Sequence, residues 1–194
     1  MEKKISGSAL FMYAVILLCI LLATAAFILY YAVFWAHTAV LWTGITTFTI
    51  LYHFGGRILL GKLTVLFPPD YHRSWFREKR FEKRLYKLLR VRKWKEKVLT
   101  FDPDAFDLSK RTYEELAFSM TKAETDHWMN ELLSLTTLFF PLLWGHFWLF
   151  FGVTVIAMLF DAQFIVVQRY NRPVLLRVIA RQKAREEKKT ALHA

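Results

Sequence analysis

The chain has few of the residues that cross-link or interrupt a fold. Its 194 residues include one cysteine, seven glycines and five prolines. A single cysteine, Cys19, excludes an intrachain disulfide framework and a multi-cysteine metal centre. Asp, Glu, Lys and Arg are absent from residues 5–56 and again from residues 132–160. Since 55% of the residues are hydrophobic and 17% are aromatic, the composition excludes a disordered chain and argues against an ordinary soluble domain.

The two uncharged segments predict helices that cross a membrane. A crossing helix needs ~20 apolar residues, so residues 5–56 have room for two, with a break near 35–38. This segment is also longer than the ~7–15 apolar residues of a secretory signal. Residues 132–160 hold two more crossings, or a shallow re-entrant hairpin, if the chain turns at 144–146. We predict four spans, at 9–34, 38–58, 130–144 and 147–168.

The formal charge of +11 is concentrated in two segments. Residues 73–97 contain twelve Lys or Arg against three Glu, and residues 169–189 contain eight against two. The positive-inside rule places both segments, together with Lys3 and Lys4, on the cytoplasmic side. Membrane lipid is the partner that this charge predicts, and nucleic acid is not predicted because proximity to a membrane already explains the sign.

These patterns together predict an all-α, polytopic membrane protein with both termini in the cytoplasm. We expect one integral membrane domain over residues 1–194. It comprises an N-terminal helical hairpin at 5–58, a central region at 66–177 and a basic cytoplasmic tail at 178–194.

Two helices are expected at the membrane surface. Residues 76–98 place apolar side chains at helical spacing among Lys and Arg, which is typical of an amphipathic interfacial helix. Attraction to anionic headgroups accounts for most of these charges. Lys93, Trp94 and Lys95 suggest more, because an interfacial indole lies between two ammonium groups that suit a phosphate or an acidic protein. After an acidic loop at 101–107, a capping box from Thr112 to Glu115 predicts the start of the next helix.

That next helix carries the candidate general base. Glu124 and His127 lie one turn apart, and a carboxylate at this distance can hold an imidazole in one tautomer. The alternative is a structural interfacial histidine, but ionisable groups at membrane depth persist mainly where they have a task. Glu-x-x-His is also half of a di-iron site, whose second motif the sequence lacks, so no metal is predicted. His53, near the inner end of the second span, is a possible accessory.

A second polar motif, from Gln168 to Pro173, follows the last apolar segment. Pro173 is expected to end that helix and to hold Arg172 extended at the water boundary. Arg169 and Arg172 suit a phosphate or carboxylate, while Asn171 or Tyr170 can donate to a developing oxyanion. The alternative is that the arginines are positive-inside flanks and Tyr170 belongs to an aromatic belt.

Three motifs, Val91-Arg-Lys-Trp-Lys95, Lys122-Ala-Glu-x-x-His-Trp128 and Val167-Gln-Arg-Tyr-Asn-Arg-Pro173, resemble the glycosyl-4,4′-diaponeurosporenoate acyltransferase family over about residues 66–177. The resemblance implies a small protein of the bacterial cell membrane that esterifies a sugar hydroxyl of a carotenoid glycolipid. It implies functional roles for Glu82, Lys93, Trp94, Lys95, Glu124, His127, Gln168, Arg169, Tyr170, Asn171, Arg172 and Pro173. The chain departs from the family pattern at Met120, where a Glu is usual, and at Asp126 and Val174, which leaves the acceptor open.

The sequence therefore predicts a membrane acyltransferase. It would move a fatty acyl group from a cytoplasmic thioester, acyl-CoA or an acyl carrier protein, to a hydroxyl of a glycosylated lipid such as a glycosyl carotenoid. The thioester is a co-substrate, and no cofactor is expected. His127 would be the base and Glu124 its partner, with Asn171 or Tyr170 at the oxyanion, in one cavity. The substrate-binding residues would be Glu82, Lys93, Trp94, Lys95, Gln168, Arg169 and Arg172.

The alternative from another class is a non-catalytic, basic membrane adaptor for a lipid or pigment pathway. A methyltransferase or reductase would need a cofactor motif, and the sequence has no glycine-rich phosphate loop.

Overall fold

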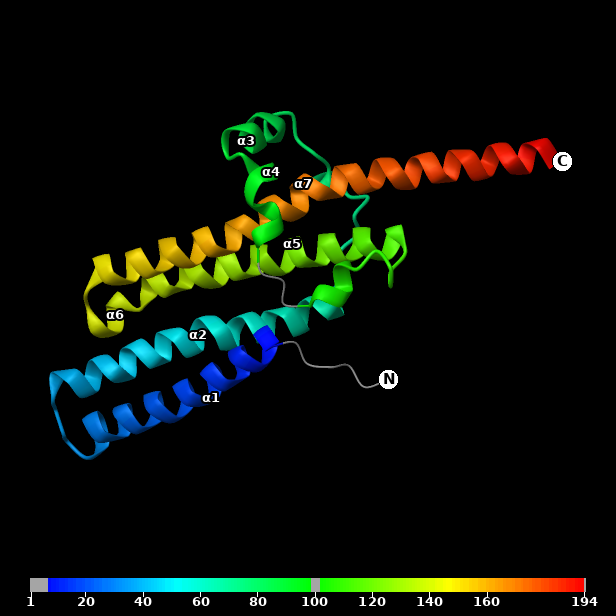
Figure 1. Ribbon diagram of the computed structural model, residues 1–194. Helices are drawn as coiled ribbons and strands as arrows, with labels where there is room; N and C mark the ends of the chain where they lie inside the picture. Colours follow the sequence, from blue (N-terminus) through cyan, green and yellow to red (C-terminus); the bar gives the residue numbers. More distant parts are fainter. Residues whose placement is uncertain (1–6, 99–101, 194) are drawn as a thin grey trace. The chain divides into compact units, whose positions relative to one another are not determined.

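A computed structural model describes residues 7–98 and 102–193, and within those ranges the chain is helical and contains no strand (Figure 1). The long helices are α1 (Gly7–Phe27), α2 (Thr38–Leu66), α5 (Tyr113–Thr136) and α7 (Phe147–His193). Shorter elements connect them: η1 (Ile28–Ala32), η2 (Ser74–Phe76), α3 (Glu82–Leu88), α4 (Val91–Trp94), η3 (Lys95–Lys97), η4 (Pro103–Phe106), η5 (Thr137–Phe139) and α6 (Pro141–Trp144). Lys3, Lys4 and Phe101, which the sequence placed at the inner surface and in the acidic loop, lie outside the described residues.

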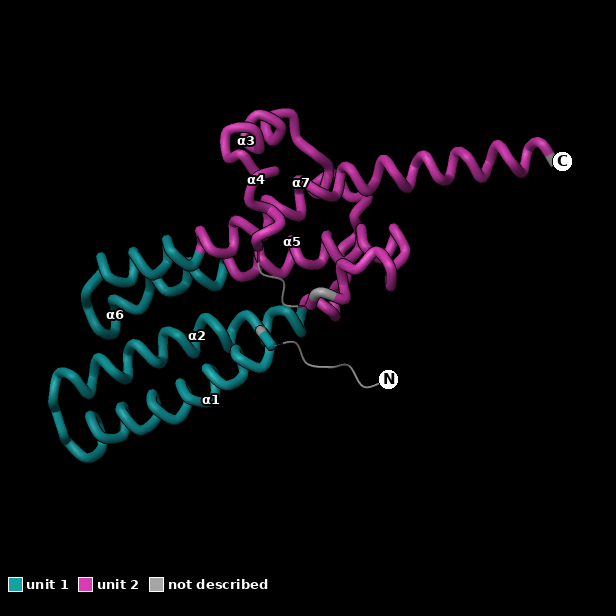
Figure 2. Tube along the Cα trace, in the orientation of Figure 1, with its two compact units in different colours: residues 1–63, 132–157 teal, residues 64–131, 158–194 magenta. Residues whose placement is uncertain are grey.

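The chain divides into two compact units (Figure 2). Unit 1 comprises residues 1–63 and 132–157, and unit 2 comprises residues 64–131 and 158–194. Both polar motifs and the basic segment belong to unit 2.

Unit 1 is an aromatic helical assembly. The helices α1 and α2 form an antiparallel hairpin across residues 33–37, which confirms the predicted break (Figure 1). Gly44 permits their close approach, because a Cβ there would lie 2.8 Å from the ring of Phe27. The core is formed by Ile45, Phe140 and Phe150.

The second predicted turn is also confirmed. Gly145 (φ +70°) and His146 (φ +58°) separate α6 from α7. Positive φ is a conformation that glycine adopts without steric cost, so Gly145 makes the reversal possible.

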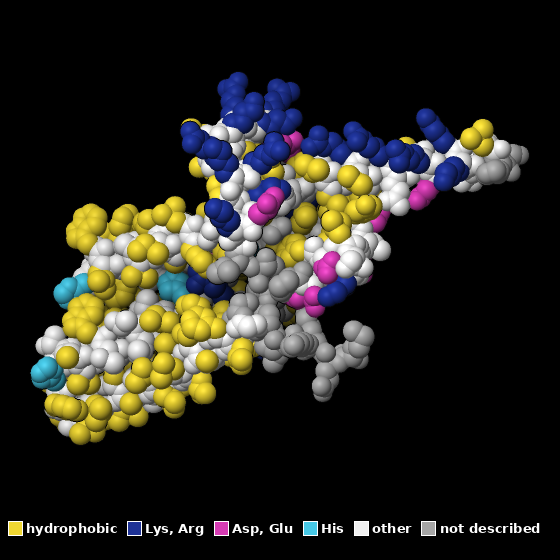
Figure 3. Space-filling model, in the orientation of Figure 1, with side chains coloured by type: hydrophobic (Ala, Val, Ile, Leu, Met, Phe, Trp, Pro, Cys, Tyr) yellow, Lys and Arg dark blue, Asp and Glu magenta, His cyan; other side chains and the backbone are white. Residues whose placement is uncertain are grey.

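Among the residues that the structure describes, two helices are long and apolar enough to cross a membrane, at Ala9–Ala32 and Phe147–Leu192. Their length and composition indicate association with a membrane. Apolar side chains cover much of the surface of α1 and α2, whereas Lys and Arg gather over α3, α4 and the C-terminal half of α7 (Figure 3). The sequence predicted four crossings, and the structure shows the coarser feature of two candidate spans.

Unit 2 is built on the packing of α5 against α7. The capping box at the start of α5 is confirmed: the Thr112 N–H donates to Glu115 Oε2 at 2.8 Å, and the Glu115 N–H donates to Thr112 Oγ1 at 3.2 Å. The core between the two helices consists of Leu116, Ala117, Leu175 and Ile179.

The predicted continuous helix over residues 76–98 is wrong. The segment forms the short pieces α3, α4 and η3, because Arg90 adopts φ +51° and interrupts the helix between α3 and α4. Apolar periodicity does not reveal such a break, since Arg90 is not a residue that usually marks one. The fragmentation lets Glu82 and Tyr86 point inward while most of the basic side chains stay exposed.

The predicted helix end at Pro173 is also wrong. The helix α7 continues through Pro173 to His193, and Arg172 is helical and buried. A proline inside a helix costs ~3 kcal/mol through the lost hydrogen bond and a steric clash. Buried contacts on both sides of it, at Arg172, Leu175 and Ile179, hold the helix against this cost.

Candidate active site

The centre of unit 2 is a buried network of two carboxylates and two guanidiniums. Arg169 on α7 donates from Nε to Glu82 Oε1 at 2.9 Å and from Nη1 to Glu124 Oε1 at 2.7 Å. Its Nη2 donates to the carbonyl oxygen of Trp75 at 3.1 Å. One side chain thereby ties η2, α3 and α5 to α7.

Arg172, one turn further along α7, completes the network. Its Nη2 lies 2.6 Å from Glu124 Oε2 and donates to the Phe76 carbonyl oxygen at 2.8 Å. Arg172 and Glu124 are almost completely buried. Charges at this depth are tolerated when each has an opposite partner and further hydrogen bonds, as these have.

Glu82 is held from a third side. The Tyr86 hydroxyl donates to Glu82 Oε2 at 3.0 Å, and the Lys79 N–H donates to the same oxygen at 3.1 Å. Burial, followed by the charge of Glu82, raises the pKa of Tyr86, so the phenol stays protonated and can donate. Glu82 was predicted to bind substrate, but it is buried and pairs with the protein's own groups.

A second cluster surrounds the candidate base. His127 Nδ1 lies 2.7 Å from Asp161 Oδ1, and the Asn130 side-chain amide donates to that oxygen at 3.1 Å. The imidazole stacks on Phe164, with ring centroids 4.4 Å apart and planes 4° apart. Asp161 is fully buried, while the His127 side chain keeps 20% of its surface exposed.

The predicted partner of His127 was wrong. Glu124 pairs with Arg169 and Arg172, and the carboxylate that contacts the imidazole is Asp161, 34 residues further along the chain. Sequence reasoning paired Glu124 with His127 because they are close in sequence. A signal for Asp161 was available, since a lone acid inside a predicted span is expensive and usually functional.

The predicted oxyanion donors lie in a third group. Lys95 Nζ donates to Asn171 Oδ1 at 2.9 Å and lies 5.3 Å from the centre of the Tyr170 ring. Ten residues of α7, a rise of ~15 Å, separate Asn171 from Asp161. Asn171 and Tyr170 are therefore grouped with Lys95, and His127 is grouped with Asp161.

The remaining predicted substrate-binding residues are Lys93, Trp94 and Gln168. Lys93 is exposed, Gln168 is half-buried on α7, and the Trp94 indole donates to the Leu89 carbonyl oxygen at 2.9 Å. Their roles in binding a substrate stay predictions, as does phosphate binding by Arg169 and Arg172. Sequence reasoning missed Trp75, which contacts the ionic network, and Asn130 and Asp161, which surround His127.

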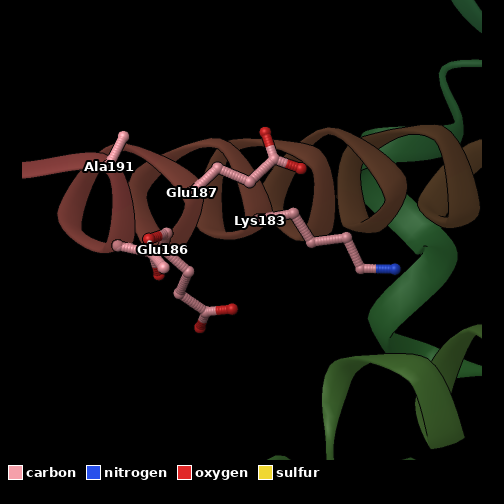
Figure 4. A pocket seen from close by; sticks show the side chains of 5 residues that line it. Lys183, Glu186, Glu187 and Ala191 are labelled. Carbon is pink, nitrogen blue, oxygen red and sulfur yellow. Dashed lines mark hydrogen bonds between the residues drawn. The ribbon is translucent and has the colours of Figure 1, made fainter. Parts of the chain in front are cut away.

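A hollow of about 510 Å³ lies elsewhere, along the C-terminal part of α7 (Figure 4). Its lining is Lys183, Glu186, Glu187, Thr190 and Ala191, all exposed side chains of a single helix. A ligand there would stay largely in water, so the hollow is not a candidate active site. In the parts of the chain that the structure describes, no group of three His, Cys, Asp or Glu is placed to hold a metal ion.

A family model for glycosyl-4,4′-diaponeurosporenoate acyltransferase matches residues 72–181. This match covers more than half of the chain, including His127, Asp161 and the whole buried ionic network. No curated protein and no solved structure matches the chain.

Proposed function

The chain belongs to the glycosyl-4,4′-diaponeurosporenoate acyltransferase family, and we propose that it transfers a fatty acyl group from a thioester donor to a sugar hydroxyl of a glycosylated lipid. The observation that carries this proposal is the His127–Asp161 pair. An imidazole that keeps part of its surface exposed, on a fully buried carboxylate, is the arrangement that a general base requires.

The proton positions follow from the chemistry of the pair. An ionised carboxylate can only accept hydrogen bonds, so Nδ1 of His127 carries the proton that points at Asp161. This fixes the tautomer and leaves Nε2 to receive a proton. Asn130 donates to the same carboxylate oxygen and restrains Asp161, while Phe164 fixes the plane of the ring.

The transfer then needs no covalent enzyme intermediate. Nε2 of His127 takes the proton of the sugar hydroxyl while the hydroxyl oxygen attacks the thioester carbonyl carbon. A carbon–oxygen bond forms, the carbon–sulfur bond breaks, and the imidazolium returns the proton to the leaving thiolate. Such acid–base catalysis contributes ~10²–10⁴-fold to the rate.

In this proposal, the polar end of the thioester donor binds to Lys95, Tyr170 and Asn171. Lys95 presents an ammonium group beside an amide, next to the exposed cations of α4 and η3. This combination suits the phosphates of coenzyme A or the phosphopantetheine of an acidic carrier protein. The glycosyl carotenoid is the acceptor that the family suggests.

The test is transfer of a labelled acyl group by the purified protein in phospholipid nanodiscs. His127→Ala should lower the rate by on the order of 10²–10⁴ while the protein stays folded. His72→Ala is the matched control, because His72 is an exposed histidine of the same unit outside the cluster. Full activity of His127→Ala would reject the assignment of the base.

The proposal includes four membrane crossings with both termini in the cytoplasm of a bacterial cell. The two candidate spans supply the first and the last crossing. The helix α2 and the segment from α5 to α6 would supply the other two, joined by the turns at 33–37 and 145–146.

A basic membrane adaptor remains the rival, and the exposed cations of α3, α4 and η3 favour it. An adaptor should tolerate Asp161→Asn, which removes one charge within the His127 cluster, but should fail when several exposed cations of 77–97 are neutralised. Glu124→Gln does not discriminate, because Glu124 is part of the buried ionic network.

A further inference from the structure

Two tryptophans from distant parts of the chain meet beside the buried network. Trp75 on η2 and Trp128 on α5 have ring centroids 5.9 Å apart and planes at 66°. Trp75 keeps 55% of its surface exposed and Trp128 keeps 38%. Both are large apolar rings, and the fold leaves part of each ring uncovered.

Both rings are held in place by the network beneath them. The Arg169 guanidinium lies 5.9 Å from the centre of the Trp75 ring and also donates to the Trp75 carbonyl oxygen. The Trp128 indole N–H points at Glu124 Oε1 at 3.4 Å. Rings fixed in advance lose little conformational freedom when a ligand stacks on them, which favours binding.

We propose that Trp75 and Trp128 form a stacking surface for the sugar ring of a glycosylated lipid, an inference that rests on the proposed function for its acceptor. A pyranose has an apolar C–H face and a rim of hydroxyls. The indole rings match the face. Arg169, whose side chain is 11% exposed, lies beside the Trp75 ring and matches the hydroxyl rim.

The position of the pair fits acyl transfer to that sugar. Trp128 directly follows His127 on α5, so the stacking surface and the base come from the same turn of one helix. Trp148 on α7 is a useful contrast. It is 78% exposed, and its ring contacts Phe147 and Phe151, as expected for an aromatic residue of a membrane surface.

The binding test uses the full-length protein in phospholipid nanodiscs without glycoside detergent. Octyl glucoside, below its micelle-forming concentration, is titrated in and binding is followed by saturation-transfer NMR. Trp75→Ala and Trp128→Ala should each raise the Kd at least about fivefold, and the Phe substitutions should raise it less. Trp148→Ala is the control and should leave the Kd unchanged. Trp75→Ala keeps the backbone carbonyl that Arg169 binds, so the network should survive.

Acyl-transfer kinetics with a glucosyl lipid acceptor provide the second measurement. Trp75→Ala should raise KM for this acceptor and leave kcat nearly unchanged. Unchanged glucoside binding in both alanine variants would overturn the stacking surface, as would weakened binding of coenzyme A with glucoside binding intact. If the wild-type protein transfers no acyl group but binds glucoside through Trp75, the proposed function fails and the stacking surface stands.

Discussion

At the scale of single residues, the site depends on which cationic group each buried carboxylate contacts. Glu124 and Asp161 are both buried, but Glu124 neutralises two guanidiniums and Asp161 contacts the imidazole. The first carboxylate is therefore expected to stabilise the fold, and the second to position the base. Substitution of each acid by its amide separates the two effects.

Asp161→Asn should lower kcat by on the order of 10²–10⁴ with little change in stability, because the amide can donate to Nδ1 and so favour the wrong tautomer of His127. The measurement is the pH profile of kcat together with thermal unfolding. Asp161→Glu should recover part of the rate by restoring a carboxylate. A variant that loses stability and activity in parallel, with an unaltered pH profile, would show that Asp161 is only structural.

Glu124→Gln should instead destabilise the protein by about 3–5 kcal/mol, because it leaves the buried Arg172 without an opposite charge. The measurement is denaturant unfolding in detergent micelles. Glu114→Gln is the control on the same helix, where an exposed acid should contribute less than ~1 kcal/mol. If the two variants lost the same free energy of unfolding, the central role of the network would be contradicted.

At the scale of elements, the start of α5 is set by local chemistry. The hydrogen bond from the Thr112 N–H, followed by the one from the Thr112 hydroxyl, lowers the pKa of Glu115 below its usual 4.5. A carboxyl group whose pKa is lowered in the folded state contributes stability at pH values above its ordinary pKa. That stability is lost as the pH falls through the lowered pKa. The first turn of α5 should therefore fray in acid.

Hydrogen exchange of the amides at 114–117 measures this fraying. Protection should fall below pH 4.5 in the wild-type protein relative to protection in the middle of α5. Glu115→Gln should remove that pH dependence, and Thr112→Ala should reduce protection at every pH. If Glu115→Gln loses amide protection in acid as the wild-type protein does, the capping box does not control the start of α5.

The helix α7 shows where element prediction failed. Pro173 was expected to end the helix because local preference disfavours proline inside one. Arg169 before it and Leu175 after it are both fixed to unit 2 by long-range contacts, which outweigh that preference. Arg90 is the opposite case, because its local sequence favours a helix and its backbone breaks one.

At the scale of the whole molecule, the sequence predicted what depends on neighbours along the chain. The capping box at Thr112 and the turn at Gly145 are local features, and both were found. The resemblance also identified the correct family. The partner of His127 was missed because the pairing of Asp161 with α5 depends on the packing register of two helices, which no spacing within either helix specifies.

The single cysteine, Cys19, makes the number of membrane crossings measurable. As the chain has a single cysteine, Cys19→Ala provides a background for single-cysteine variants. Ala36→Cys tests the α1–α2 turn, Ser109→Cys the loop before α5, and Lys189→Cys the end of α7, all exposed positions. Labelling of intact cells with a membrane-impermeant maleimide reports which positions face outward.

Four crossings predict that Ala36→Cys is labelled from outside and that Ser109→Cys and Lys189→Cys react only after the cells are permeabilised. Two crossings, by α1 and α7 alone, would leave everything between those helices outside, so Ser109→Cys would then be labelled in intact cells. Ser109 therefore decides between the two topologies. An external Ser109 would also place the beginning of α5 away from cytoplasmic thioesters, so the donor assignment would fail together with the four-crossing topology.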